Sequence, residues 1–405
     1  MPRETVVSSG TTITLGFVEG DLIVEKGSLV KGEGTPPKVN VSGTVTCDGD
    51  CKFECSLIAE EFEGEGDITV EGDLEVKGDV EVSDGQLYVT GKMSARDIEV
   101  DRSLTVDKDL RAEHVDVGGS LEVKGSVIAE TIDVGGSFTG FSEVKVDSID
   151  VGGSVHIDSK IEAKTLDVGG RVIVKGGRIE EVGVGGSFES EDSFEFGSID
   201  VGGAVRLTGK NVGGDIDVGG SCKVDGDLKF KRIDVGGVTE ISGAAEGESL
   251  DVGGTVHVGS SLRLSGSLDV GGKVEVKGEL SAQDVDVGGS LEARKVIAKD
   301  KVSVGGSIAT ADGVHARYVE IGRRGKVSGP IYADEVLIRE RATVGDIHAK
   351  SIEMERKAQA RNLYGEKIRL ESDCQILGEV QYTQSLETEK GVKLARPSEK
   401  VEKLP

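Results

Sequence analysis

The sequence is organised by one phrase, Asp-Val-Gly-Gly, which first appears at residues 116–119. Its valine returns at steps of 17 residues, apart from one step of 16 and one of 18. A period this short and regular predicts a solenoid, in which each repeat is one coil stacked on the last. The recurring positions are Val117, Val134, Val151, Val168, Val184, Val201, Val218, Val235, Val252, Val270, Val287 and Val304.

Within one coil the apolar residues alternate in short runs separated by corners. Alternate side chains of a strand share a face, so each coil offers three inward apolar pairs. The pattern argues against a helix, because each glycine inside a helix lowers its stability by about 1 kcal/mol relative to alanine. We therefore predict an all-β, single-stranded, three-sided β-solenoid with about 17 residues per coil and about 20 coils. In the coil after Val117 the pairs are Leu121 with Val123, Val127 with Ala129, and Ile132 with Val134.

Each residue of the Asp-Val-Gly-Gly phrase has its own predicted structural role. The valine is core, and the two glycines form a corner through positive φ or through close approach of stacked backbones. The aspartate is expected to accept a hydrogen bond from a backbone N–H of that corner. The inward position of Leu121 stays apolar in later coils, with Thr239 as the polar exception.

Three regions follow from these patterns. Residues 1–35 are expected to form an N-terminal β segment, and one role for it is to cap the end of the solenoid. Residues 39–380 form the solenoid, with regular Asp-Val-Gly-Gly coils over 100–317 and more basic coils over 318–380. Residues 381–405 are polar, carry mixed charge and lack the period, so we expect a disordered tail.

The net charge and the apolar content of the chain limit which partners and which cellular location are expected. The formal net charge is -26, which argues against nonspecific nucleic-acid binding. No stretch approaches the ~20 apolar residues of a membrane span, so membrane contact is not expected. Five cysteines without regular pairing argue against a disulfide scaffold. A cytoplasmic location is the resulting expectation.

Residues 318–383 resemble a bactofilin domain. The stretch opens with Tyr318-Val319-Glu320-Ile321, and Ile331 and Ala333 or Ile347 and Ala349 repeat an apolar-x-alanine pattern similar to the bactofilin coil. The resemblance implies a right-handed, three-sided β-helix in a cytoskeletal protein that polymerises by stacking coil ends, without nucleotide. The regular coils over 100–317 resemble the same kind of coil more loosely.

Three cysteines at spacings of four form the sharpest local motif. Cys47, Cys51 and Cys55 suggest a zinc or iron–sulfur site, but either site needs a fourth ligand or an open position. Alternation places Cys51 and Cys55 on the inward face together with Phe53, where cysteine behaves as a small core residue. We favour buried core over metal.

An aspartate precedes Val-Gly-Gly in ten coils. If the coils stack in register, these carboxylates form a row about 4.8 Å apart along the surface. Such a row would attract cations, and its oxygen ligands suit calcium. We favour the structural interpretation, in which each aspartate accepts a hydrogen bond from the backbone of its own corner. The ten are Asp116, Asp133, Asp150, Asp167, Asp200, Asp217, Asp234, Asp251, Asp269 and Asp286.

We expect no catalytic site and no cofactor. The coil length varies by one residue, so almost no inserted loop could build a cleft. The five histidines recur with no fixed acidic or serine partner, and no phosphate-binding loop is visible. The histidines are His114, His156, His257, His315 and His348.

The sequence leaves three functions open. The first is a structural scaffold or filament subunit that associates with itself through the solenoid ends, and the second is a monomeric acidic rod that binds cations or a partner. An enzyme on a β-helix is third. The basic last coils favour an acidic partner, such as the acidic coils of another copy, over nucleic acid. Their cations are Arg323, Arg324, Lys326, Arg339, Arg341, Lys350, Arg356, Lys357, Arg361, Lys367 and Arg369.

Overall fold

A computed structural model describes residues 3–405. In these residues every helix or strand assigned is a β-strand, and parallel strands stack about 17 residues apart in a β-solenoid of about 23 turns. The predicted fold class is confirmed. Residues 3–405 contain no helix with the length and apolarity needed to cross a membrane. The chain divides into two compact units, Met1–Gly202 and Gly203–Pro405.

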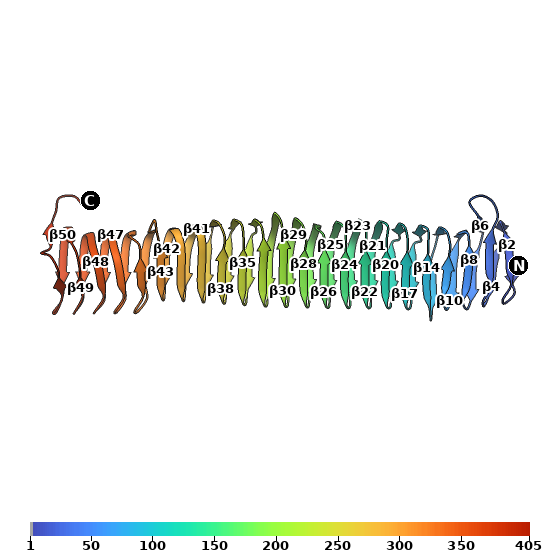
Figure 1. Cartoon of the computed structure of the whole chain (residues 1–405), viewed down its shortest axis with the longest axis horizontal. Helices are drawn as coiled ribbons and strands as arrows, with labels where there is room; N and C mark the ends of the chain where they lie inside the picture. The colour runs from blue at the N-terminus through green and yellow to red at the C-terminus, as the bar shows by residue number, and fades with distance from the viewer. Residues whose placement is uncertain (1–2) are drawn as a thin grey trace. The chain divides into compact units, whose positions relative to one another are not determined.

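Three strands make one coil at the start of the N-terminal unit. Each strand pairs in parallel with the strand three places later, so the strands within residues 4–32 pair with the coils that follow (Figure 1). The first coil contains β1 (Glu4–Val7), β2 (Thr12–Leu15) and β3 (Phe17–Val18), and the second contains β4 (Asp21–Glu25), β5 (Leu29–Gly32) and β6 (Lys38–Val41).

Farther along this unit two sides of the coil merge into one longer strand. Both β18 (Leu110–Arg111) and β19 (His114–Val117) pair with β21 (Val127–Val134). From there, eight-residue strands alternate with four-residue strands. The former include β23 (Val144–Val151), β25 (Ile161–Val168) and β27 (Gly177–Val184), and the latter β20 (Ser120–Val123), β22 (Ser137–Gly140) and β24 (Ser154–Ile157).

The C-terminal unit lengthens its strands toward the basic coils. The two longest, β41 (Lys273–Val287) and β42 (Ser290–Val304), pair with each other through two register shifts. The basic coils follow with the same parallel pairing. Their long strands are β44 (Val314–Ile321), β46 (Ile331–Ile338), β47 (Thr343–Met354) and β48 (Gln359–Leu370).

The structure differs from the sequence prediction over residues 381–405, which were expected to be disordered. β50 (Val380–Thr388) pairs with β48, β51 (Lys393–Leu394) pairs with β49 (Gln375–Ile376), and β52 (Glu399–Lys400) pairs with β50. The existing sheet edge supplies backbone partners whatever the side chains are. A polar composition therefore does not prevent these residues from extending the stack.

The inward column predicted from Leu121 is present. Leu121 lies beside Phe138, and Phe138 beside Val155, all at most 1% exposed. In the C-terminal unit Thr239 lies between Cys222 and Val256 in the equivalent column and is 0% exposed. Within residues 3–405 its hydroxyl oxygen has no hydrogen-bond partner.

Close backbone approach, rather than positive φ, explains the double glycines. A Cβ on Gly135 would lie 2.2 Å from the carbonyl oxygen of Gly118, and a Cβ on Gly152 would lie 2.4 Å from that of Gly135. None of these three glycines has a φ in the left-handed region. Of the two reasons expected from sequence, only the second applies at these corners.

Two neighbouring glycines allow a matched test of this packing. Gly185→Ala would place a Cβ 2.5 Å from the Gly169 oxygen, so we expect it to lower the free energy of unfolding by about 1–3 kcal/mol. In Gly183→Ala the Cβ meets nothing closer than 3.6 Å, so this control should be neutral or stabilising by up to about 1 kcal/mol. Urea unfolding of both variants measures the difference, and equal shifts would contradict the packing argument.

Candidate functional site

The predicted row of aspartates exists in each unit. In the N-terminal unit Asp116, Asp133, Asp150 and Asp167 are successive partners on parallel strands, and Gly183 then separates Asp167 from Asp200. In the C-terminal unit the row runs through Asp217, Asp234, Asp251, Asp269 and Asp286, and Ser303 follows. Parallel neighbours in a sheet lie about 4.8 Å apart, so these carboxylates face one another along the surface.

The corner amides do not depend on these aspartates. The Gly135 N–H donates to the Val117 carbonyl at 3.0 Å, and the Gly136 N–H donates to the Gly119 carbonyl at 2.9 Å. The hydrogen bonds therefore run from coil to coil. The expectation that each aspartate serves its own corner is wrong for this corner, because the preceding coil already supplies the acceptors.

Two aspartates of the row have a raised pKa, first because of partial burial and then because of the neighbouring carboxylates. The pKa of Asp150 is raised by partial burial and then by the charges of Asp133 and Asp167. The pKa of Asp251 is raised by the same two causes, with Asp269 and Asp234 as the neighbours. At Asp150 and Asp251 the ionised state is therefore costly, and a positive counter-charge beside them is favourable.

The acidic row also extends farther toward the N-terminus than the phrase predicts. Glu63, Glu81 and Glu99 continue it in register up to Asp116. The sequence carries this signal as steps of 18 and 18 residues between the glutamates and a step of 17 from Glu99 to Asp116, but these glutamates do not belong to an Asp-Val-Gly-Gly phrase.

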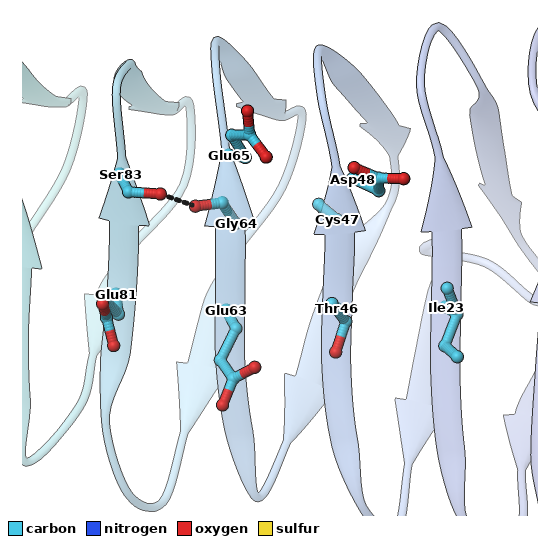
Figure 2. Close-up of a pocket in the computed structure, with 9 residues that line it drawn as sticks. All are labelled: Ile23, Thr46, Cys47, Asp48, Glu63, Gly64, Glu65, Glu81 and Ser83. Atoms are coloured by element: carbon cyan, nitrogen blue, oxygen red, sulfur yellow. Dashed lines mark hydrogen bonds between the residues drawn. The ribbon is translucent and has the colours of Figure 1, made fainter.

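A shallow hollow of about 400 Å³ lies beside the start of this row (Figure 2). Glu63 and Glu81 project from neighbouring strands, and the Ser83 hydroxyl donates to the Gly64 carbonyl at 3.3 Å. Within residues 3–405 no group of three His, Cys, Asp or Glu side chains could hold a metal ion. The hollow is lined by Ile23, Thr46, Cys47, Asp48, Glu63, Gly64, Glu65, Glu81 and Ser83.

The three predicted cysteines lie in the core. Cys47, Cys51 and Cys55 are 1%, 4% and 0% exposed, and the Cys51 thiol donates to the Val24 carbonyl at 3.4 Å. Burial raises the pKa of Cys47 and raises that of Cys55 to about 11, while a hydrogen bond from Cys47 lowers that of Cys51. Protonated, buried thiols pack as small apolar residues.

The basic coils of the C-terminal unit carry a cluster of ion pairs at one corner. Glu340 is only 7% exposed, and its carboxylate contacts Arg323, Arg341 at 3.5 Å and Arg356 at 3.4 Å. The hydrogen bond from Arg323, despite a smaller opposing effect of desolvation, lowers the pKa of Glu340. A hollow of about 360 Å³ opens here, lined by Arg323, Arg324, Glu340 and Arg341.

A stack of rings on the same coils was not predicted. His315, Tyr332, His348 and Tyr364 are successive partners, with ring centroids 4.8, 5.0 and 4.6 Å apart. Burial lowers the pKa of His348, which lies between two tyrosines. Steps of 17, 16 and 16 residues between these aromatic side chains are the signal in the sequence that predicts the stack.

The other histidines are on open sheet surface. The ring of His114 lies 2.8 Å from the Thr131 hydroxyl, that of His156 lies 2.7 Å from Asp158, and that of His257 lies 3.5 Å from Glu275. The side chains of the His156–Asp158 pair are about half exposed.

Removing one charge from the row tests its electrostatics. The raised pKa of Asp150 means that its ionised form destabilises the fold above the ordinary aspartate pKa, and that this cost disappears as the pH falls. We expect Asp150→Asn to increase the free energy of unfolding at pH 7 by about 0.2–1 kcal/mol and to lose that advantage near pH 3.

Glu122→Gln is the matched control, because Glu122 lies between Thr105 and Thr139 rather than between acids. Urea unfolding at both pH values measures the effect. A gain of the same size from both variants would show that the row's repulsion is not its cause.

The chain was compared with protein-family models, curated proteins and solved structures. No family model, curated protein or solved structure matches it. Its function must therefore be argued from the coil, its surfaces and its terminal strands.

Proposed function

We propose that the chain is a non-enzymatic structural protein that assembles with further copies by stacking first and last coils, without nucleotide. A β-solenoid fits a structural or repeat scaffold. The narrower part of the proposal, a cytoskeletal protein of the bactofilin kind, is supported by the sequence resemblance over residues 318–383.

The observation that carries the proposal is that the first and last coils have corners with the same conformation and the same hydrogen bond. The amide of Ser9 donates to the Glu25 carboxylate at 2.9 Å, and the amide of Ser372 donates to the Glu389 carboxylate at 3.0 Å. Each acceptor opens the triplet Glu-Lys-Gly, whose glycine has a positive φ, 72° at Gly27 and 86° at Gly391. The first coil of one copy can therefore stack on the last coil of another copy, with the same corner conformation continued across the junction.

The first coil also presents a backbone edge that could receive a partner. The Leu29 N–H donates to the Thr11 carbonyl at 2.8 Å, and the Glu33 N–H donates to the Leu15 carbonyl at 2.9 Å. Backbone groups alternate sides along a strand, so those of Thr12 and Thr14 point away from β5. Within residues 3–405 no strand pairs with that edge. Such an edge is a template for another strand.

We also propose a cytoplasmic location, which the state of the cysteine thiols supports. All five cysteines are free and buried. Unpaired thiols are typical of proteins from a reducing compartment.

A proline in the first coil tests assembly through this edge. Thr14→Pro removes an N–H that the chain itself does not use, and proline is tolerated on edge strands. We expect the native chain to form assemblies that lengthen with concentration in negative-stain electron microscopy, and Thr14→Pro to keep the mass of a single chain in light scattering. Circular dichroism and melting temperature should be unchanged.

Thr14→Ala is the control, since it alters the side chain and keeps the N–H, and it should assemble like the native chain. A native chain with a single-chain mass at every concentration would refute the filament and favour the alternative function, a monomeric acidic binding module. Unimpaired assembly of Thr14→Pro would refute the use of this edge.

A further inference from the structure

Four successive corners of the basic coils hold a residue with a side chain in the left-handed backbone region. The φ values are 59° at Arg324, 59° at Arg341, 62° at Lys357 and 62° at Asp373. Glycine takes this conformation without strain and stands at the same place in the next corner, Gly391. At three of the four corners a long cationic side chain, Arg324, Arg341 or Lys357, stands where glycine would be less strained, which suggests that the side chain has a function.

Three of these corners share a second feature, a backbone amide that donates a hydrogen bond to a carboxylate from the next coil. The Glu340 amide donates to Glu355 at 2.9 Å, and the Arg356 amide donates to Glu371 at 3.0 Å. The Ser372 amide does the same with Glu389. Each corner amide is thus a carboxylate-binding group, and the chain supplies the carboxylate itself.

The corner at Arg323 breaks this pattern. The residue equivalent to Glu355 is Arg339, since Ile338 and Met354 are register partners immediately before them. Arg339 turns onto the sheet face, where it contacts Glu320 and Glu355, each at 2.8 Å. Within residues 3–405 the Arg323 amide has no hydrogen-bond acceptor, so the chain's own carboxylate is missing from this corner alone among the four.

The surroundings of that amide are strongly positive. Arg323, Arg324 and Arg341 line the hollow of about 360 Å³ together with one carboxylate, Glu340. Glu340 is already engaged by Arg323, Arg341 and Arg356. Among the described residues Arg324 has no ion-pair partner, so its guanidinium is available for an incoming anion.

We propose that the hollow at Arg323, Arg324 and Arg341 binds a carboxylate group from outside the chain. The incoming group would accept a hydrogen bond from the Arg323 amide, as Glu355, Glu371 and Glu389 do at the following corners. The Arg324 guanidinium would supply a charge-assisted contact. The carboxylate belongs either to an acidic protein segment or to a free small acid, and the two sources share this chemistry.

Isothermal titration calorimetry of the full chain at low ionic strength tests the site with two probes, succinate and a hexaglutamate peptide. Arg324→Gly removes the guanidinium and suits the φ of 59°, so the fold and melting temperature should be retained. Loss of one charge-assisted hydrogen bond should weaken binding about tenfold or more. Lys357→Gly is the matched control, because it removes a cation from an equivalent corner whose amide already contacts Glu371.

The expected result is saturable binding that Arg324→Gly weakens about tenfold and Lys357→Gly changes less than about twofold. Binding of the peptide alone would identify an acidic protein segment as the source, and binding of succinate as well would admit a small acid. The proposal is overturned by the absence of saturable binding, by equal effects of the two variants, or by inorganic phosphate binding more tightly than both probes.

Discussion

The structure depends on the close approach of successive coils at their corners. The amide of Gly136 lies 2.9 Å from the carbonyl oxygen of Gly119, and a methyl group on Gly136 would lie 2.4 Å from that oxygen. Only glycine leaves room for such contact, which explains why pairs of glycine mark each regular coil. The backbone hydrogen bonds between parallel strands set the spacing of one coil on the next, and glycine at these corners leaves room for that spacing.

Register turns sequence spacing into surface chemistry. A residue type that returns every 16 to 18 positions becomes a continuous row, whether of carboxylates from Glu63 to Asp167 or of rings from His315 to Tyr364. The rows have opposite energetics. Like-charged carboxylates at this spacing repel one another, and at Asp150 this repulsion adds to the effect of burial in raising the pKa, while stacked rings attract one another. Where the corner changes from Gly-Gly to the four-residue turns at Arg324 and Arg341, the surface changes from acidic to basic.

The sequence predicted the fold because the period, the alternation and the glycines all point to the same coil. It predicted the register of the aspartates for the same reason. It did not predict that the corner amides bond to the previous coil, since Asp133 could have served its own turn equally well. It also failed at Gln381 and beyond, because polar residues pair through their backbone once an edge exists. The missing carboxylate at the Arg323 corner could not be predicted from the sequence. Only the strand register shows that Arg339 stands at the position where the following corner has a glutamate.

Stacking of one copy on another is tested most directly by amide hydrogen exchange, followed by mass spectrometry as a function of protein concentration. Peptides covering Thr12–Leu15 and Lys393–Leu394 report the edge strands of the first and last coils. Pairing between copies predicts that exchange in both peptides slows as concentration rises, while central strands such as Val144–Val151 stay equally protected throughout. Exchange in the edge peptides that is fast and independent of concentration would contradict assembly through the terminal coils.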